Sequence, residues 1–329
     1  MITRRKIVIA LGAGALAPFA SFAQQPPAKV FRIGVLHTET EASTVRRGIP
    51  EALRAGLSDL GYVEGRNIVF EFRFADGKLE RLEGLAAELV ALNVDVIVTH
   101  STQGVMAVSR ATRTIPIVVQ SSSDMVALGV AASLARPGGN VTGSTFFFNE
   151  LNVKRLELIK EVMPRITQVA VLLRRGNPGH VSTLPIMGKA AKSLKVELQT
   201  FEVVALAEFD GAFTAMAKKR LNAVVIPDDP LFLSNPKAIA DLATAKHMLS
   251  VGSPTYAEAG VTIGYGVDFV AQWRRVGFFV DKILRGAKSG DIPIEQPTKF
   301  DFVLNMKTAK ALGIKIPNSV LVRATKVIQ

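Results

Sequence analysis

Apolar and polar positions in the first half of the chain alternate between two spacings. Short β-branched runs predict buried parallel strands, and apolar residues three and four positions apart predict helices. The predicted strands cover 30–36, 67–74, 94–100 and 115–119, and the predicted helices cover 43–60, 78–92, 103–112 and 125–135. Strands and helices that alternate over short connections are typical of a doubly wound parallel sheet.

A second, similar series follows the polar segment Asn140–Ser144. Its predicted helices cover 151–162, 184–194, 207–218 and 238–246, and its predicted strands cover 169–173, 196–204, 223–229 and 249–252. The remaining elements exceed what a second five-stranded half needs. We therefore expect two α/β lobes with a cleft between them, and a chain that recrosses near residues 260 and 290. The first lobe would hold 30–142 plus about 261–290, and the second 143–260 plus about 291–329.

The N-terminal segment 1–23 has the pattern of a secretory signal peptide. Three basic residues precede an apolar run, and a small-x-small pattern at 20–23 predicts cleavage after Ala23. The apolar run is short and Pro18 interrupts it, which argues against a membrane anchor. Adjacent Arg4 and Arg5 leave both the Sec and the twin-arginine route open. The sequence thus predicts export to the periplasm.

Composition excludes several kinds of chemistry. The chain has no cysteine, and its four histidines are widely spaced, so neither a thiolate nor an HExxH-type metal site is expected. The formal charge is +12, but the basic residues are scattered and no nucleic-acid partner is expected. No GxSxG elbow, P-loop or dinucleotide-binding glycine motif is present outside the signal segment. We therefore expect neither an enzyme nor a cofactor.

Polar residues follow several predicted strands of the first half, where parallel sheets bind ligands. The loop after 115–119 contains Ser121, Ser122 and Asp124 and precedes a predicted helix, so these residues either cap that helix or bind a ligand anion as well. The other candidates at strand ends are His37, Thr38, Ser101 and Thr102.

Two further candidates lie in the second half. Asp228 and Asp229 end the strand at 223–229, where a carboxylate would either sit in a solvated turn or bind an ammonium group, and Asp228 is the favoured ligand contact. Tyr256 follows another strand and would either line the cleft or pack in the core. These residues complete the predicted ligand-binding set.

Three long motifs then resemble one family. GVAASLARPGGNVTGS (129–144), KRLELIKEVMP (154–164) and EQPTKFDFVLNMKTAKALGIKIPNSVLVRA (295–324) resemble the substrate-binding proteins of ABC transporters, in the group with tryptophan- and tyrosine-type members. The resemblance runs from about residue 30 to 329. It implies a type I periplasmic-binding fold, with two lobes, three crossovers and a solute in the cleft.

The resemblance also implies a function. Members with known ligands bind amino acids, often aromatic ones, so we expect a monomer that binds a small amino-acid-like solute, closes by a hinge and docks on a membrane permease. On this interpretation, amides and hydroxyls of one lobe bind the carboxylate of the solute, and the negative charge of Asp228 balances its amino group. The alternative is a periplasmic sensory receptor that presents its ligand to a membrane signalling protein.

Overall fold

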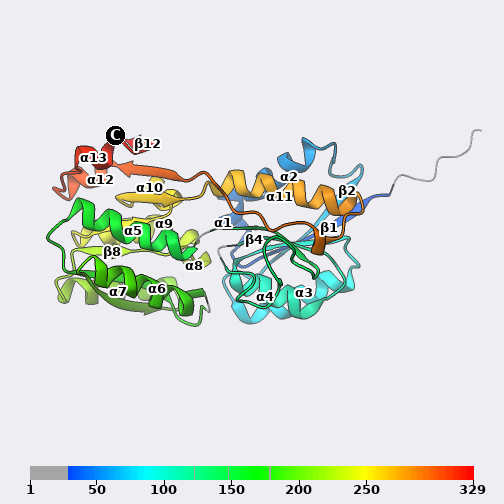
Figure 1. Ribbon diagram of the computed structural model, residues 1–329, viewed down its shortest axis with the longest axis horizontal. Coiled ribbons are helices and arrows are strands. Elements are labelled where there is room, and N and C mark those ends of the chain that lie inside the picture. The colour runs from blue at the N-terminus through cyan, green and yellow to red at the C-terminus, as the bar shows by residue number, and fades with distance from the viewer. Residues whose placement is uncertain (1–28, 122, 147, 178) are drawn as a thin grey trace, which may run out of the picture.

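The computed structural model describes residues 29–329 except 122, 147 and 178, and it forms two lobes that lie side by side (Figure 1). Each lobe contains one largely parallel sheet with helices on both faces. This confirms the predicted two-lobe α/β fold class. The predicted signal segment at 1–23 and the candidate Ser122 lie outside the described residues.

The first lobe is built on a five-stranded sheet whose neighbouring strands all run parallel. In spatial order its strands are β2 (Ile68–Phe74), β1 (Phe31–His37), β3 (Val96–His100), β4 (Ile117–Ser121) and β5 (Val141–Thr145). Its helices are α1 (Glu41–Arg46), α2 (Ile49–Ser58), α3 (Leu82–Ala91), α4 (Ser101–Ala111) and α11 (Phe269–Leu284). The 3₁₀ turns η1 (Leu79–Arg81) and η3 (Ser289–Asp291) complete it.

The second lobe repeats this strand order and extends it by two strands. In spatial order the sheet contains β7 (Glu197–Val203), β6 (Gln168–Arg174), β8 (Ala223–Val225), β9 (Leu249–Gly252), β10 (Ile263–Gly266), β11 (Asp301–Asn305) and β12 (Lys326–Ile328). Only the β10–β11 pair is antiparallel among these described strands. The helical segments are α5 (Phe148–Val162), α6 (Gly179–Ser193), η2 (Leu206–Glu208), α7 (Phe209–Lys218), α8 (Pro230–Ser234), α9 (Pro236–Ala245), α10 (Pro254–Glu258), α12 (Met306–Ala311) and α13 (Asn318–Leu321).

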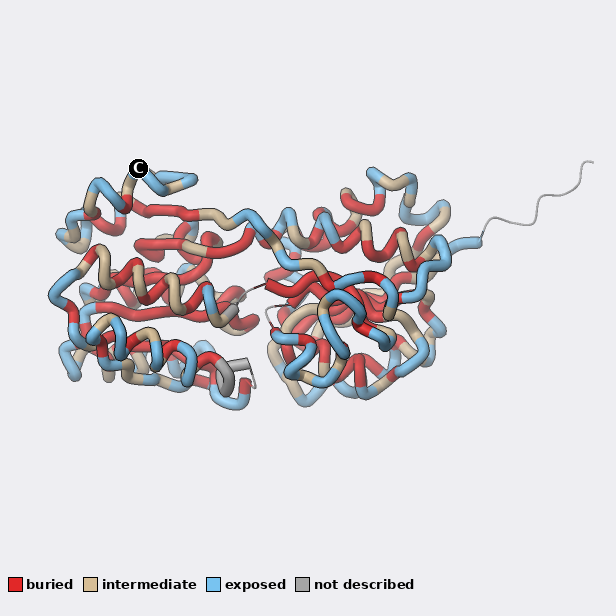
Figure 2. Tube along the Cα trace, in the orientation of Figure 1, coloured by how far each residue is buried: buried red, intermediate tan, exposed pale blue. Residues whose placement is uncertain are grey.

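Burial explains why the central strands form. Every residue of β4 and β5 is buried, as expected for parallel strands covered on both faces (Figure 2). In the first lobe one core cluster packs under α3 and α4, and another packs under α2 and α11. Two more clusters cover the two faces of the second sheet. Hydrophobic burial on both faces therefore stabilises each lobe separately.

Helix α11 comes late in the sequence but belongs to the first lobe. Its apolar residues recur at helical spacing, and Trp273, Val276 and Phe279 are buried against that sheet. The Asp268 carboxylate caps the helix by accepting the Ala271 amide at 3.0 Å. Because α11 crosses α2 closely, a Cβ atom on Gly277 would lie 2.6 Å from the carbonyl carbon of Gly56.

The chain passes between the lobes three times, at positions that differ from the predicted ones. β5 is paired with β4 to Thr145, so the predicted boundary after residue 142 falls inside a strand of the first sheet. β10 belongs to the second sheet, although 261–290 was assigned to the first lobe. The last crossing follows Glu295, which pairs with Ser144. The β-branched run at 261–266 predicted a strand correctly, but such a run does not indicate which of the two sheets the strand joins.

The segment 125–135, predicted as a helix, consists of turns instead. One helical turn forms where the Leu128 amide bonds the Asp124 carbonyl at 3.0 Å. Gly129 then adopts φ +70°, and the next two amides return to the Met125 carbonyl. The left-handed glycine ends the helix after one turn, while Met125 and Ala131 still pack into the core.

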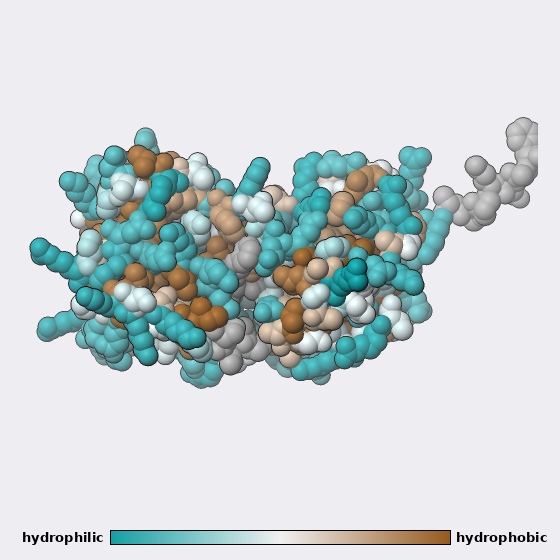
Figure 3. Space-filling model, viewed as in Figure 1, coloured by the Kyte–Doolittle hydropathy of each residue, from teal (hydrophilic) through white to brown (hydrophobic). Residues whose placement is uncertain are grey.

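The face of the molecule seen in Figure 3 is mainly hydrophilic on both lobes. Hydrophobic residues form separate areas among hydrophilic ones in this view. Among the described residues, no helix is both long and apolar enough to cross a membrane.

Candidate functional site

The carboxyl ends of the two sheets face each other across the junction of the lobes and enclose a cavity of about 40 Å³. Its walls come from both lobes: Arg47, His100, Ser101, Thr102, Gln103, Gln120 and Trp273 from the first, and Asn177, Asp228, Asp229, Pro230 and Leu233 from the second. Phe146 and Phe269 also line it, from segments next to the crossings, and pack with the core of the second lobe. Such a crevice beyond the strand ends is where open α/β sheets bind ligands.

The two lobes are in contact around this cavity. Arg174 donates to the Gly77 carbonyl at 2.9 Å, and the Ser43 and Ser234 hydroxyls are 3.1 Å apart. A cavity of this size has room for only a few water molecules, at roughly 10–15 Å³ each. A larger solute can therefore enter only when the lobes separate, which requires a hinge motion.

Asp228 has one carboxylate oxygen occupied and one open. Its Oδ2 accepts from Arg155 Nη2 at 2.8 Å, whereas Oδ1 is buried and has no hydrogen-bond partner in the described part of the protein. Arg155 is fully buried and also donates to the Tyr265 carbonyl and the Asn152 side chain. A buried carboxylate oxygen without a donor is costly, so Oδ1 is suited to accept one from a ligand.

Asp229 has a different role from its neighbour. Its Oδ1 accepts the Leu231 amide at 2.8 Å and caps α8, and its Oδ2 accepts from Asn177 at 2.7 Å. Arg174 Nη1 lies 3.7 Å from Oδ1. These protein contacts engage both oxygens, so Asp229 fixes the local loop while Asp228 keeps a free acceptor.

Ser101 and Thr102 open helix α4 at the cavity wall. Ser101 has the left-handed backbone angle φ +63°, and its hydroxyl accepts the Gly104 amide at 3.2 Å. The Thr102 hydroxyl bonds the Ser123 hydroxyl. Both residues thus brace the helix start and also line the cavity, so the capping interpretation holds and the ligand-binding one stays a prediction.

His37 and Thr38 are buried beside the cavity rather than on its wall. The His37 ring stacks on Phe74 with centroids 5.2 Å apart and lies 5.3 Å from the Trp273 ring. Thr38 donates weakly to Glu39 at 3.4 Å. Neither residue is in the lining of the cavity, and Trp273 of α11 lies against His37. Their direct contact with a solute stays a prediction.

Glu39 joins these residues into a charged network that sequence reasoning missed. Its Oε1 accepts from Arg47 at 2.7 Å, and its Oε2 lies 2.9 Å from His100 Nε2. Burial by itself would raise the pKa of Glu39, but His100 and Arg47 outweigh it and hold that pKa below the ordinary value. Burial, followed by the charge of His100, lowers the pKa of His37 to about 3, so His37 is neutral at neutral pH.

Three other predicted contacts lie away from the cavity. Ser121 is buried, and its hydroxyl donates to Ser123 and accepts the Ser123 amide. Asp124 is exposed and caps its own turn by accepting the Val126 and Ala127 amides. Tyr256 is fully buried in the second core. In each case hydrogen bonds within the loop or apolar neighbours engage the side chain, as the structural interpretation expects, and contact with a solute stays a prediction.

Tyr256 still contributes to the site from behind. Its hydroxyl lies 3.3 Å from the Pro227 carbonyl, next to the two aspartates. Burial raises the pKa of Tyr256 well above its ordinary value, and the charges of Asp228 and Asp229 raise it further. The phenol therefore stays neutral and supports the aspartate loop without reaching the cavity.

The aromatic wall was also missed from sequence. Phe146, Phe269 and Trp273 line the cavity, and the Phe146 and Phe269 rings meet edge to face at 5.6 Å. Phe269 and Trp273 are on α11, which the sequence placed in the first lobe without relating it to the strand ends. The only available signal was that Trp273 is the single tryptophan of the chain.

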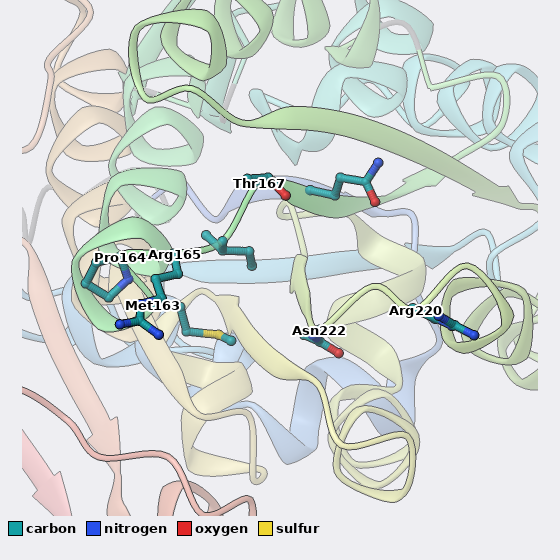
Figure 4. A pocket seen from close by; sticks show the side chains of 8 residues that line it. Met163, Pro164, Arg165, Thr167, Arg220 and Asn222 are labelled. Atoms are coloured by element: carbon teal, nitrogen blue, oxygen red, sulfur yellow. The ribbon is translucent and has the colours of Figure 1, made fainter.

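Larger hollows occur elsewhere on the surface. Figure 4 shows one of about 500 Å³ between the end of α5 and the starts of β6 and β8, with Met163, Arg165 and Arg220 at its rim. It lies at the amino ends of these strands, the opposite edge from the cavity. Parallel sheets carry their ligand sites at the carboxyl ends, so the interlobe cavity is the candidate site.

Known proteins share this architecture. The model of a family described as ABC transporter substrate binding protein matches residues 39–328. A tyrosine-binding protein of Clostridioides difficile is 26% identical over 261 residues, covering 79% of this chain and 74% of that protein.

Two solved structures are similar over most of the chain. A conserved domain protein from Vibrio cholerae has a TM-score of 0.84 and 27% identity, covering 91% of this chain and all of that one. An ABC domain from Streptococcus pneumoniae, in complex with L-Trp, has a TM-score of 0.83 and 24% identity over the same shares. On the extent of the family match, this chain belongs to the substrate-binding proteins of ABC transporters, a family of non-catalytic binding proteins.

Proposed function

We propose that this protein binds an α-amino acid in the interlobe cavity, with aromatic amino acids as the first candidates, and delivers it to the membrane permease of an ABC importer. The open Oδ1 of Asp228 carries this proposal. A buried carboxylate oxygen that Arg155 holds in place on the cavity wall is suited to an ammonium group.

The other walls fit the rest of such a solute. The start of α4 offers amides and the Ser101 and Thr102 hydroxyls to a carboxylate. The buried Gln120 Nε2 and the Gln103 side-chain amide have no hydrogen-bond partner among the described residues. Their N–H groups would also donate to the solute carboxylate. Phe146, Phe269 and Trp273 provide aromatic contact for a side chain, and the tyrosine-binding relative supports this choice.

Export to the periplasm is part of the same proposal. A receptor that hands solute to a permease must work outside the cytoplasmic membrane, and the segment 1–23 has the pattern of a cleaved export signal. In the closed form, both lobes contact the solute, so closing depends on solute binding and marks the loaded receptor for the permease.

Isothermal titration tests the binding step. The mature protein is unfolded, dialysed free of ligand, refolded and titrated with each of the common amino acids. We expect at least one to bind with one site per chain. If none binds to protein whose refolding is confirmed by circular dichroism, the amino-acid assignment is wrong.

A further inference from the structure

Three side chains that commonly bind metals meet beneath the interlobe cavity. One ligand atom each from His37, Glu39 and His100 can be chosen so that all lie within 4.8 Å of one another. His100 Nε2 and Glu39 Oε2 are 2.9 Å apart. We propose that His37, Glu39 and His100 bind a divalent transition-metal ion of the Zn²⁺ class. Sequence spacing did not indicate this site, because His37 and His100 meet only when β1 and β3 pair.

The donor set fits this class of ion. Imidazole nitrogens and carboxylate oxygens bind Zn²⁺ at about 2.0–2.2 Å, and two imidazoles with one carboxylate form a known transition-metal set. Ca²⁺ and Mg²⁺ prefer oxygen donors alone. Ligands that surround one ion at such distances must lie a few ångströms from one another, and the cluster meets this requirement without a change of fold.

His37 provides an independent indication of a ligand. Its side chain is 1% exposed, and neither Nδ1 nor Nε2 has a hydrogen-bond partner in the described part of the chain. A buried imidazole without any partner is unusual and requires an explanation. A metal ion bound to one nitrogen would satisfy it.

The surroundings hold the three ligands in position. Arg47 fixes Glu39 through Oε1 and leaves Oε2 toward His100. The stacked Phe72 and Phe74 rings restrict the His37 ring. Such outer contacts orient metal ligands and raise affinity.

All three ligands come from the first lobe, so the site is complete in the open and closed forms. It therefore goes beyond the proposed solute binding and does not depend on it. His100 also lines the interlobe cavity, which leaves a coordination position for water or an oxygen of a bound solute. Two neutral imidazoles and one carboxylate leave a Zn²⁺ ion with net positive charge, so an anionic oxygen is favoured there.

Direct titration with ZnCl₂ tests this site. The mature chain is produced without a histidine tag, treated with chelator, and titrated calorimetrically in parallel with MgCl₂. We expect one Zn²⁺ per chain and no Mg²⁺ binding. The chain has no cysteine, so no thiolate competes for Zn²⁺ in this titration.

Variants then locate the ion. Glu39→Gln and His100→Gln should each weaken Zn²⁺ binding by at least about tenfold, since removal of even an outer contact costs about 10–100-fold. His247→Ala removes an exposed histidine and should leave the affinity unchanged. Circular dichroism checks that each variant is folded. If a ligand variant does not fold, Zn²⁺-dependent shifts of the His37 and His100 imidazole signals in the NMR spectrum of the wild-type protein replace it.

Failure of this proposal is distinct from failure of the solute proposal. If the wild-type protein binds no Zn²⁺, or if binding is lost in His247→Ala and kept in Glu39→Gln, the metal site is wrong. Absence of Zn²⁺-dependent shifts at both His37 and His100 would have the same meaning. Amino-acid titrations carried out in the presence of chelator are unaffected by any of these outcomes.

Discussion

The Arg155 guanidinium holds the Asp228 carboxylate at the cavity wall, with Nη2 2.8 Å from Oδ2, and the buried Oδ1 has no hydrogen-bond partner among the described residues. Arg155 is fully buried and Asp228 nearly so. The pair lies in the second lobe, because Arg155 is on α5 and Asp228 follows β8. The carboxylate is thus held in place by the protein itself, and a group fixed in advance in this way costs less to order when the ammonium group that we propose for it binds.

Breaking this pair should destabilise the second lobe. Arg155→Met leaves Asp228 as an uncompensated buried charge, which typically costs about 3–5 kcal/mol. Thermal and urea unfolding of the purified variant would measure the loss. Arg165→Met is the matched control, since Arg165 is exposed, and it should change the free energy of unfolding little. Equal stability of the two variants would show that the buried pair is not as described.

The close crossing of α2 and α11 predicts a second stability effect. Gly277→Ala would place a Cβ atom 2.6 Å from the Gly56 carbonyl carbon, so the helices must move apart. Overpacking of this kind costs about 1–3 kcal/mol. Gly188→Ala, in the middle of α6 with open space around its Cβ position, should instead be neutral or stabilise by up to about 1 kcal/mol. Chemical denaturation of both variants distinguishes packing from helix propensity, and similar destabilisation in both would argue against the close crossing.

The single tryptophan should report solute binding. Trp273 is 2% exposed and lines the cavity, so a bound solute changes the surroundings of its ring. We expect an amino acid that binds in calorimetry to change the tryptophan emission with the same dissociation constant. Trp273→Phe should abolish the signal while the calorimetric binding remains measurable. An unchanged emission at saturating solute would place the binding site elsewhere.

Export predicts a defined mature N-terminus. When the full chain is expressed with its own leader in a Gram-negative host, the periplasmic fraction should contain protein that begins at Gln24. Intact-mass measurement checks this N-terminus. A variant in which Arg4, Arg5 and Lys6 are all replaced by uncharged residues should accumulate uncleaved in the cytoplasm. Secretion of uncleaved protein, or full-length protein confined to the cytoplasm of the wild-type strain, would contradict the signal assignment.

The sequence predicted features that depend on neighbouring residues better than features that depend on contacts between distant segments. Buried strands such as Ile117–Ser121 could be predicted because covered parallel strands are continuous apolar runs. The position of Ser101, Thr102 and Asp228 at the cavity wall could be predicted because Ser101 and Thr102 directly follow β3 and Asp228 lies three residues beyond β8. The helix at 125–135 failed because composition does not show that Gly129 takes φ +70°.

Contacts between distant segments were beyond such reasoning. Trp273 covers His37 only because α11 returns to the first lobe, 236 positions later in the chain. The Glu39 network likewise joins the ends of two strands and the residue after α1. Local periodicity identifies which face of an element is buried but not which element covers it.

The central claim is that Asp228 binds the amino group of the solute. The most direct measurement is calorimetric titration of ligand-free wild-type and Asp228→Asn protein with tyrosine, or the amino acid that binds most tightly, and with its analogue lacking the amino group. A hydrogen bond to a charged group is worth about 1.5–3 kcal/mol, so the wild-type protein should prefer the amino acid by about 10–100-fold, and Asp228→Asn should lose most of that preference. Asp241→Asn, at an exposed position, should retain it. Equal affinity of the wild-type protein for both compounds, or an undiminished preference in folded Asp228→Asn protein, would contradict the account.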